Sequence, residues 1–371
     1  MDAEGKQLLM QVQSLIRSSR QIAARGVNSL QVITNYEIGH LIVEHEQKGR
    51  KRAEYGKQIV KELSGELSLE FGKGFSKSNL EYMRRFFLEY KGRLPRITQT
   101  LSGQLTERVE KNYALSKKSP SWQKITSDAK TPFHLSWSQY VFLLGIADDK
   151  QRQFYEIEAS ENNWSLRELK RQYNSGLYER LALSRDKKKI KELCLKGQLV
   201  EKPEDLLKEP YVLEFLGLDE KAVYSERDLE SAIIDKLEHF LLELGKGFLF
   251  EARQKRFTFD ADHFFVDLVF YNRILRCYVV IDLKIGRLTH QDLGQMQMYV
   301  NYFDRYIRMK DENPTIGIIL CKMKNDALVK LTFPKDTKVY PARYQLYVPS
   351  KEKLRQMLLE WTQETEVNEK G

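Results

Sequence analysis

Two acidic residues and a lysine lie inside a largely apolar stretch, and their placement constrains the fold more than any other feature of the chain. The stretch covers residues 264–286 and reads FFVDLVFYNRILRCYVVIDLKIG. Its alternating and β-branched residues predict two strands joined by a short polar turn. Asp267 falls in the first strand, whereas Asp282 and Lys284 fall in the second. Alternate residues of a strand point to the same side, so Asp282 and Lys284 are predicted to share a face.

Charges inside an apolar hairpin are costly unless a partner compensates them. Oxygen ligands from two carboxylates, together with several retained waters, suit Mg²⁺. The pattern therefore favours a metal-dependent hydrolytic site that contains Asp267, Asp282 and Lys284. The alternative is a structural ion pair between Asp282 and Lys284.

Composition points to a polyanionic partner. The chain has 371 residues, of which 61 are Lys or Arg and 52 are Asp or Glu, giving a net charge of +9. A basic protein of this kind most often binds nucleic acid. The three cysteines, Cys194, Cys277 and Cys321, have neither zinc-ligand spacing nor the pattern of a disulfide framework.

The sequence contains no targeting or membrane signal. The first residues lack the apolar segment of a signal peptide, and no apolar run reaches the length of a membrane span. We therefore expect a cytoplasmic protein without a membrane partner. The absence of organelle signals fits a prokaryotic or viral-like source.

Residues 1–185 are predicted to form an all-α, helix-turn-helix-like region that binds DNA. Ser76 is a suitable N-cap for a helix over residues 77–90. The basic side chains of this helix are Lys77, Arg84 and Arg85. The helix is either a recognition helix or a capped core helix with a solvated basic face, and the sequence leaves both interpretations open.

A second group of short helices is predicted between residues 136 and 183, after a long polar connection over residues 91–132. Ser165 and Glu168 form a capping box at the start of the last of these helices. A basic helix in such a group is typical of a DNA reader. The basic positions expected to be exposed are Arg167, Lys170, Arg171 and Arg180. The charge-rich residues 186–225 are interpreted as a hinge.

Residues 226–362 predict an α/β domain with the element order α-β-β-β-α-β-α-β. The first helix follows the capping residue Ser225 and carries Glu230. The helix that begins at Thr289 carries Gln295 and Tyr299, which lie one turn apart on the same face.

These motifs resemble those of the PD-(D/E)XK nucleases, which have an acid in the first helix, an Asp in one strand, Asp/Glu-x-Lys in the next, and Gln-x-x-x-Tyr in the following helix. The segments DLVFYNRILRCYVVIDLKIG, LGQMQMYVNYFD and DENPTIGIILCK resemble more narrowly the YhcG-type (DUF1016) bacterial proteins. The resemblance implies a restriction-endonuclease-like domain with an α-β-β-β-α-β core and a mixed sheet. One departure is Asp282, where the usual motif is Glu-Leu-Lys, although the wider superfamily accepts either acid.

The resemblance also implies a metal site. Asp267 and Asp282 would bind Mg²⁺, which Mn²⁺ would replace, with help from the backbone carbonyl of Leu283. Glu230 would complete the coordination directly or through a water. Its alternative role is that of an acid favoured by the dipole near a helix N-terminus.

Further roles follow from the same resemblance. Lys284 would orient or activate the attacking water, and Gln295 would hold Lys284 or a phosphate oxygen. Tyr299 would support this side of the site or would pack in the core. Arg273 and Arg287 flank the motifs and are candidate phosphate contacts, with surface solvation as the alternative.

Taken together, these features predict a Mg²⁺-dependent deoxyribonuclease with an N-terminal DNA-binding region, and the resemblance alone implies a link to restriction, defence or mobile DNA. DNA is the expected partner, with restriction-modification or mobile-element proteins as further partners. A double-strand cut by a chain with one site would favour a homo-oligomer. Two alternatives stay open: a non-catalytic DNA-binding or assembly module that retains a nuclease fold, and an RNA-acting nuclease.

Overall fold

The computed structural model describes residues 27–46, 53–91, 133–184, 187–218, 224–259, 262–332 and 337–358. The chain divides into two compact units, Met1–Arg152 and Gln153–Gly371, and this division falls inside the helical region predicted over residues 1–185. The connection predicted over residues 91–132 lies outside the described residues, except for residue 91. Within the described ranges, no helix is long and apolar enough to cross a membrane.

The first unit is helical. Its elements are a helix over residues 27–46, α2 (Ala53–Phe71), the 3₁₀ helix η1 (Lys73–Phe75), α3 (Lys77–Glu89), α6 (Trp137–Leu144) and the start of α7 (Asp149–Glu161). Ser76 caps α3 as predicted, because its side chain accepts the Asn79 amide at 3.3 Å. The helix over residues 27–46 approaches the backbone of α3 closely at Gly39, where a Cβ atom would collide with the Met83 carbonyl group.

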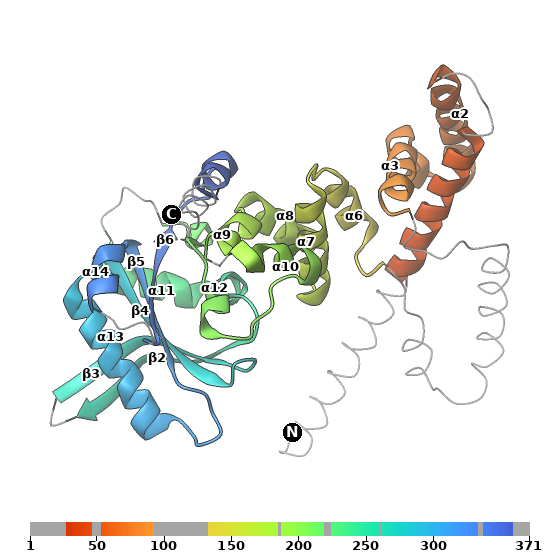
Figure 1. Ribbon diagram of the computed structural model, residues 1–371. Coiled ribbons are helices and arrows are strands. Elements are labelled where there is room, and N and C mark those ends of the chain that lie inside the picture. The colour runs from red at the N-terminus through yellow and green to blue at the C-terminus, as the bar shows by residue number, and fades with distance from the viewer. Residues whose placement is uncertain are drawn as a thin grey trace, which may run out of the picture. The chain divides into compact units, whose positions relative to one another are not determined.

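The second unit contains a six-stranded mixed sheet with helices on both faces (Figure 1). Its helices are α8 (Leu166–Asn174), α9 (Leu177–Leu183), α10 (Lys187–Lys196), α11 (Glu226–Asp235), α12 (Leu237–Leu244), α13 (His290–Tyr302), α14 (Asp326–Thr332) and a helix over residues 351–358, with short 3₁₀ and π turns η2 (Pro203–Leu206), η3 (Glu214–Leu216) and η4 (Phe303–Ile307). Its strands are β1 (Tyr211–Val212), β2 (Phe248–Phe259), β3 (Asp262–Asn272), β4 (Cys277–Arg287), β5 (Ile316–Met323) and β6 (Val339–Gln345).

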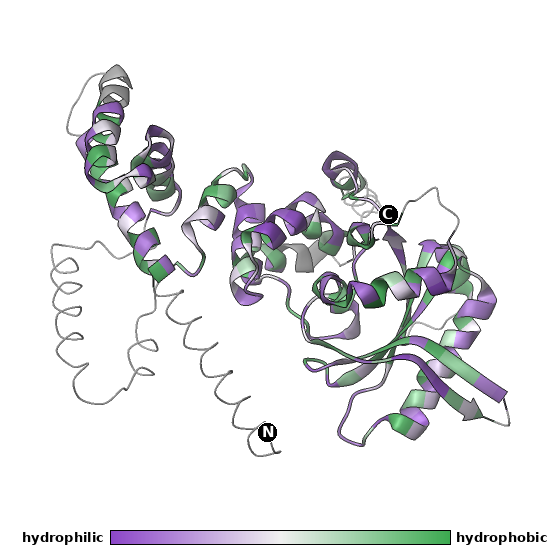
Figure 2. Cartoon of the chain, turned by 180° about the vertical axis from the view of Figure 1, so that it is seen from behind, coloured by the Kyte–Doolittle hydropathy of each residue, from purple (hydrophilic) through white to green (hydrophobic). Residues whose placement is uncertain are grey.

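The strand order is β1-β6-β5-β4-β3-β2. The pairs β2–β3 and β3–β4 are antiparallel, whereas β4–β5, β5–β6 and β1–β6 are parallel. One face packs against α11 and α12, and the other packs against α13. Figure 2 shows the apolar residues concentrated along the central strands. The predicted α-β-β-β-α-β core and mixed sheet are therefore confirmed.

Some elements differ from the expectation. The helix predicted after Ser225 is broken at Lys236 into α11 and α12, and the predicted hinge contains strand β1. The last strand was expected at YQLYV, residues 344–348, but β6 covers Val339–Gln345. Proline is normally confined to the edges of sheets. Pro341 is tolerated because β1 pairs only with Tyr344 and Gln345, which leaves the edge of β6 beside Pro341 without a strand partner among the described residues.

A network of buried charges ties α8 and α9 to the sheet domain. Arg180 is fully buried, and its Nη1 donates to Glu243 Oε1 at 2.5 Å. The same oxygen accepts the Val212 amide of β1 at 3.0 Å, and Arg171 Nη2 lies 3.4 Å from Glu243 Oε2. Burial alone would raise the pKa of Glu243, but the surrounding positive charges, led by Arg180, lower it to about 2.

The expected exposure of Arg180 is therefore wrong, and Arg171 is also largely shielded, with 14% of its side chain exposed. The helical pattern alone could not reveal this, because the partner Glu243 lies 63 positions further along the chain.

Glu243→Gln should lower the free energy of unfolding by about 3–5 kcal/mol, because it leaves the buried Arg180 charge without its counter-charge. Urea denaturation provides the measurement. Glu238→Gln, at an exposed acid of the same helix, is the control and should cost less than about 1 kcal/mol. Equal stability of the two variants would contradict the structural role of the buried pair.

Candidate active site

The site forms where strand β3 separates from β4. The two strands pair from Asn272–Cys277 to Leu268–Ile281, and beyond this point β3 continues to pair with β2. Asp267, which precedes Leu268 in β3, is the first residue beyond the end of this pairing. Its Oδ2 accepts the backbone amide of Leu283 at 2.8 Å, so a carboxylate takes the place of a main-chain acceptor at the fork.

Asp282 and Lys284 lie on β4 beside this fork. Asp282 is 2% exposed, and its Oδ2 lies 2.8 Å from Lys284 Nζ. The structure thus confirms that these side chains share a face. Burial and the negative charge of Asp267 raise the pKa of Asp282 to about 7, although the Lys284 ammonium opposes this shift. The two carboxylates are therefore close enough to repel each other.

Lys284 is surrounded by acids. Besides Asp282, it lies 3.7 Å from Glu226 of α11 and 4.0 Å from Asp292 of α13. Burial would lower the pKa of Lys284, but the negative charges of Asp282 above all, and then of Glu226 and Asp267, raise it above its ordinary value. Neither Glu226 nor Asp292 was predicted to be part of the site. The sequence shows the capping box of Thr289 and Asp292. It does not show that Asp292 approaches Lys284.

Glu230 is buried on α11 and reaches the same region. One of its oxygens accepts Arg253 Nε, and the other accepts Gln254 Nε2 at 2.5 Å. Gln254 Nε2 also donates to Asp267 Oδ1 at 2.9 Å. Glu230 is therefore linked to Asp267 through a glutamine that the sequence analysis did not single out. A direct contact of Glu230 with a metal stays a prediction.

Gln295 and Tyr299 link α13 to strand β3 next to the fork. Gln295 Nε2 donates to the Tyr299 hydroxyl at 2.6 Å, and that hydroxyl donates to the Phe265 carbonyl of β3 at 2.8 Å. Burial and the negative charge of Asp282 raise the pKa of Tyr299 to about 12. Within the described residues Gln295 thus contacts Tyr299, where contact with Lys284 or a phosphate was expected.

The donor set fits a hard divalent cation. Within the described ranges, no group of three or more His, Cys, Asp or Glu side chains is arranged to hold a metal. Mg²⁺, however, usually takes one or two carboxylates and keeps several waters. Asp282 Oδ2 is buried and has no hydrogen-bond partner among the described residues, only its ion pair with Lys284. A buried carboxylate oxygen left in this state is available to a metal.

The candidate DNA contacts are distributed over both units, and several of them lie near acids. In α3, Arg84 lies 2.8 Å from Glu46. Lys77 and Arg85 each lie 3.9 Å from an acid one turn along the same helix. In the second unit the exposed candidates are Arg167, Lys170, Arg273 and Arg287.

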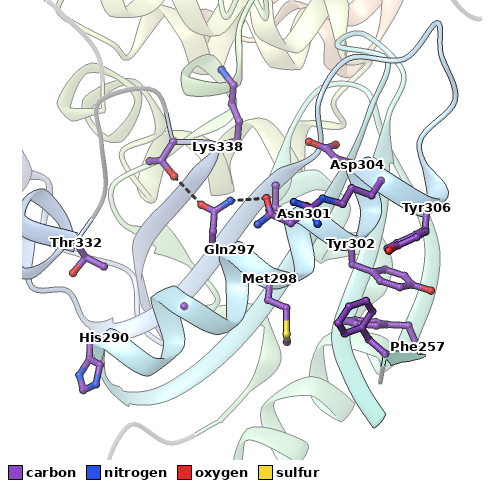
Figure 3. A pocket seen from close by; sticks show the side chains of 15 residues that line it. Phe257, His290, Gln297, Met298, Asn301, Tyr302, Asp304, Tyr306, Thr332 and Lys338 are labelled. Atoms are coloured by element: carbon purple, nitrogen blue, oxygen red, sulfur yellow. Dashed lines mark hydrogen bonds between the residues drawn. The ribbon is translucent and has the colours of Figure 1, made fainter. Parts of the chain in front are cut away.

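A cavity of about 900 Å³ lies along the outer side of α13. Figure 3 shows Phe257 and Tyr302 stacked at one end of it, and their ring centroids are 3.9 Å apart. Its lining contains neither Asp267 nor Asp282 nor Lys284. The carboxylate site at the fork is therefore separate from this cavity.

Comparison with known proteins agrees with the fold and the motifs. Residues 204–359 match the YhcG PDDEXK nuclease domain, and residues 11–180 match the DUF1016 N-terminal domain. The protein "Putative nuclease YhcG" of Escherichia coli (strain K12) is 39% identical over 350 residues, which cover 93% of this chain and 91% of the relative.

Two solved structures share a smaller part. A repair endonuclease from Pyrococcus abyssi is 19% identical, with a TM-score of 0.24, over 35% of this chain and 50% of its own. An EndoMS-dsDNA2 complex is 16% identical, with a TM-score of 0.25, over 35% of this chain and 48% of its own. The chain thus matches about half the length of each. The resemblance drawn from the motifs is confirmed by the sequence matches: the chain belongs to the YhcG family of nucleases, with a DUF1016 N-terminal domain and a PD-(D/E)XK nuclease domain.

Proposed function

We propose that this protein is a metal-dependent deoxyribonuclease that hydrolyses phosphodiester bonds at the β3–β4 fork. The observation that carries the proposal is the buried Asp282, which lies beside a second carboxylate and has a single lysine as its ion-pair partner among the described residues. Burial of a carboxylate that also faces a second, partly exposed carboxylate is costly in the absence of a cation. Strongly perturbed titrating groups are also concentrated at functional sites.

Asp267, Asp282 and the Leu283 carbonyl would hold Mg²⁺ or Mn²⁺. When bound, the cation stabilises charge on the phosphoryl oxygens and lowers the pKa of a bound water. Lys284 would orient the attacking water and offset the charge of the phosphate. Water adds to phosphorus, the ester bond to the leaving oxygen breaks, and a phosphate monoester and a hydroxyl group result.

DNA is the proposed substrate because of the net charge of +9 and the exposed cations on both α3 and α8. A panel of labelled duplex, branched and single-stranded DNA and of RNA, incubated with Mg²⁺, Mn²⁺ or EDTA, tests the proposal. Asp267→Ala is the blank, and cleavage of RNA alone would contradict the assignment to DNA.

Lys284→Ala should reduce cleavage by about 100-fold or more, because it removes a charge that acts on the reacting phosphate. DNA affinity should change little, and the variant should remain folded although it loses the counter-charge of the buried Asp282. Lys310→Ala removes an exposed lysine and serves as the matched control. A Lys284→Ala protein that cleaves at the wild-type rate would contradict the role of this lysine.

Stability should depend on pH and metal through Asp282. Its pKa in the fold is higher than in the unfolded chain, so the metal-free fold binds a proton that the unfolded chain releases. The stability contributed by this proton is lost as pH rises from about 4 to about 7. Asp282→Asn should therefore raise the Tm of the metal-free protein at pH 8, by about 2–4 °C for each kcal/mol recovered.

The same variant should lose the response to metal. A hundredfold excess of Mg²⁺ or Mn²⁺ over its Kd should raise the Tm of the wild type by roughly 5–10 °C. Asp282→Asn should show little shift under the same conditions. Equal shifts in the two proteins would place the metal elsewhere.

The double variant Arg167→Gln with Lys170→Gln should weaken DNA binding and flatten its salt dependence. The slope of log Kd against log salt should fall in magnitude by about 0.9 for each phosphate that the variant no longer neutralises. Lys77→Gln with Arg85→Gln tests α3 in the same way.

The control is Lys196→Gln with Lys202→Gln, which also removes two positive charges, at exposed positions outside these two helices. A similar weakening in this control would mean that net charge, rather than these helices, governs binding.

A further inference from the structure

Gln254 has a backbone conformation that is rare inside a strand. Its φ is +45°, in the left-handed region that favours glycine. It lies on β2 opposite Asp267, between the pairs Arg253–Leu268 and Lys255–Val266. A glutamine is strained at such a position, so its presence there points to a role for its amide.

The amide joins two acidic side chains. Its Nε2 has two hydrogens, and these are donated to Glu230 Oε2 at 2.5 Å and to Asp267 Oδ1 at 2.9 Å. Asp267 Oδ2 meanwhile accepts the Leu283 amide at 2.8 Å. The Asp267 carboxylate is thus held through both oxygens, which limits its rotation.

Glu230 is also held through both oxygens, because Arg253 Nε donates to the one that Gln254 does not contact. Its negative charge is therefore balanced by Arg253 before any metal binds. Gln254 itself is neutral. It can fix Asp267 without adding a positive charge, whereas a lysine or arginine at this position would oppose binding of a cation.

We propose that Gln254 is a positioning residue that orients Asp267 toward the metal, and that Glu230 acts on the site through Gln254 rather than as a ligand. This inference rests on the proposed metal-dependent nuclease function. Partners that orient a metal ligand typically change metal affinity or activity by about 10–100-fold when they are replaced.

Gln254→Gly separates the effect of the side-chain amide from that of the backbone conformation. Glycine adopts the positive φ without strain, and the substitution removes the side chain. The matched control is Arg276→Gly, which makes the same kind of change at φ +50° in the turn between β3 and β4. Gln254→Met keeps the approximate size of the side chain, removes both donors and adds no charge. Circular dichroism establishes that each full-length variant is folded.

Two measurements are then made. Hydrogen–deuterium exchange of the metal-free protein follows the amides of residues 281–285. The Leu283 amide should exchange about tenfold faster in both Gln254 variants, since its charged acceptor is no longer fixed. Titration with Mn²⁺, followed by electron paramagnetic resonance, should give a Kd that is about 10–100-fold weaker in both, with Arg276→Gly close to the wild type.

Wild-type exchange at Leu283 in a folded Gln254 variant would overturn the positioning role, whatever the metal result. Unchanged Mn²⁺ affinity in both Gln254 variants would overturn it as well. A wild-type protein that binds no Mn²⁺ would instead remove the proposed metal function, and the exchange data would still decide whether Gln254 positions Asp267. If one variant fails to fold, the other decides.

Discussion

The hydrogen bond from the Leu283 amide to Asp267 Oδ2 organises the site because it forms where the sheet divides. A buried backbone amide without an acceptor is costly, and β3 no longer pairs with β4 at this point. The Asp267 carboxylate supplies the missing acceptor. It is thereby brought next to Asp282 on the neighbouring strand, so the position of the first carboxylate follows from the geometry of the sheet.

Two buried acids in the same unit show how differently the protein compensates a buried negative charge. Glu243 is surrounded by Arg180, Lys208 and Arg171, and its pKa falls to about 2. Asp282 is also buried, but it has one lysine and faces a second carboxylate, and its pKa rises to about 7. The first cluster is compensated within the protein and ties helices to the sheet. The second carries a negative charge that the protein compensates poorly, which is the condition that favours a bound cation.

The sequence predicted the part of the site that depends on local periodicity. Asp282 and Lys284 could be placed on one face because alternation within a strand is a backbone property. Gln254 could not be found, since its contacts depend on a positive φ in β2 and on the register with β3. The buried Arg180 was misassigned because helical spacing does not reveal a partner 63 residues away. Strand β1 was missed because two residues are too few for a periodic pattern.

The most direct test of the account is a crystal structure of the protein soaked with Mn²⁺, with anomalous diffraction used to locate the metal. The account predicts an anomalous peak at the β3–β4 fork, with oxygens of both Asp267 and Asp282 about 2.0–2.2 Å from the metal and water completing the coordination. A peak bound by neither carboxylate, or no peak at the fork in crystals of active protein, would contradict it.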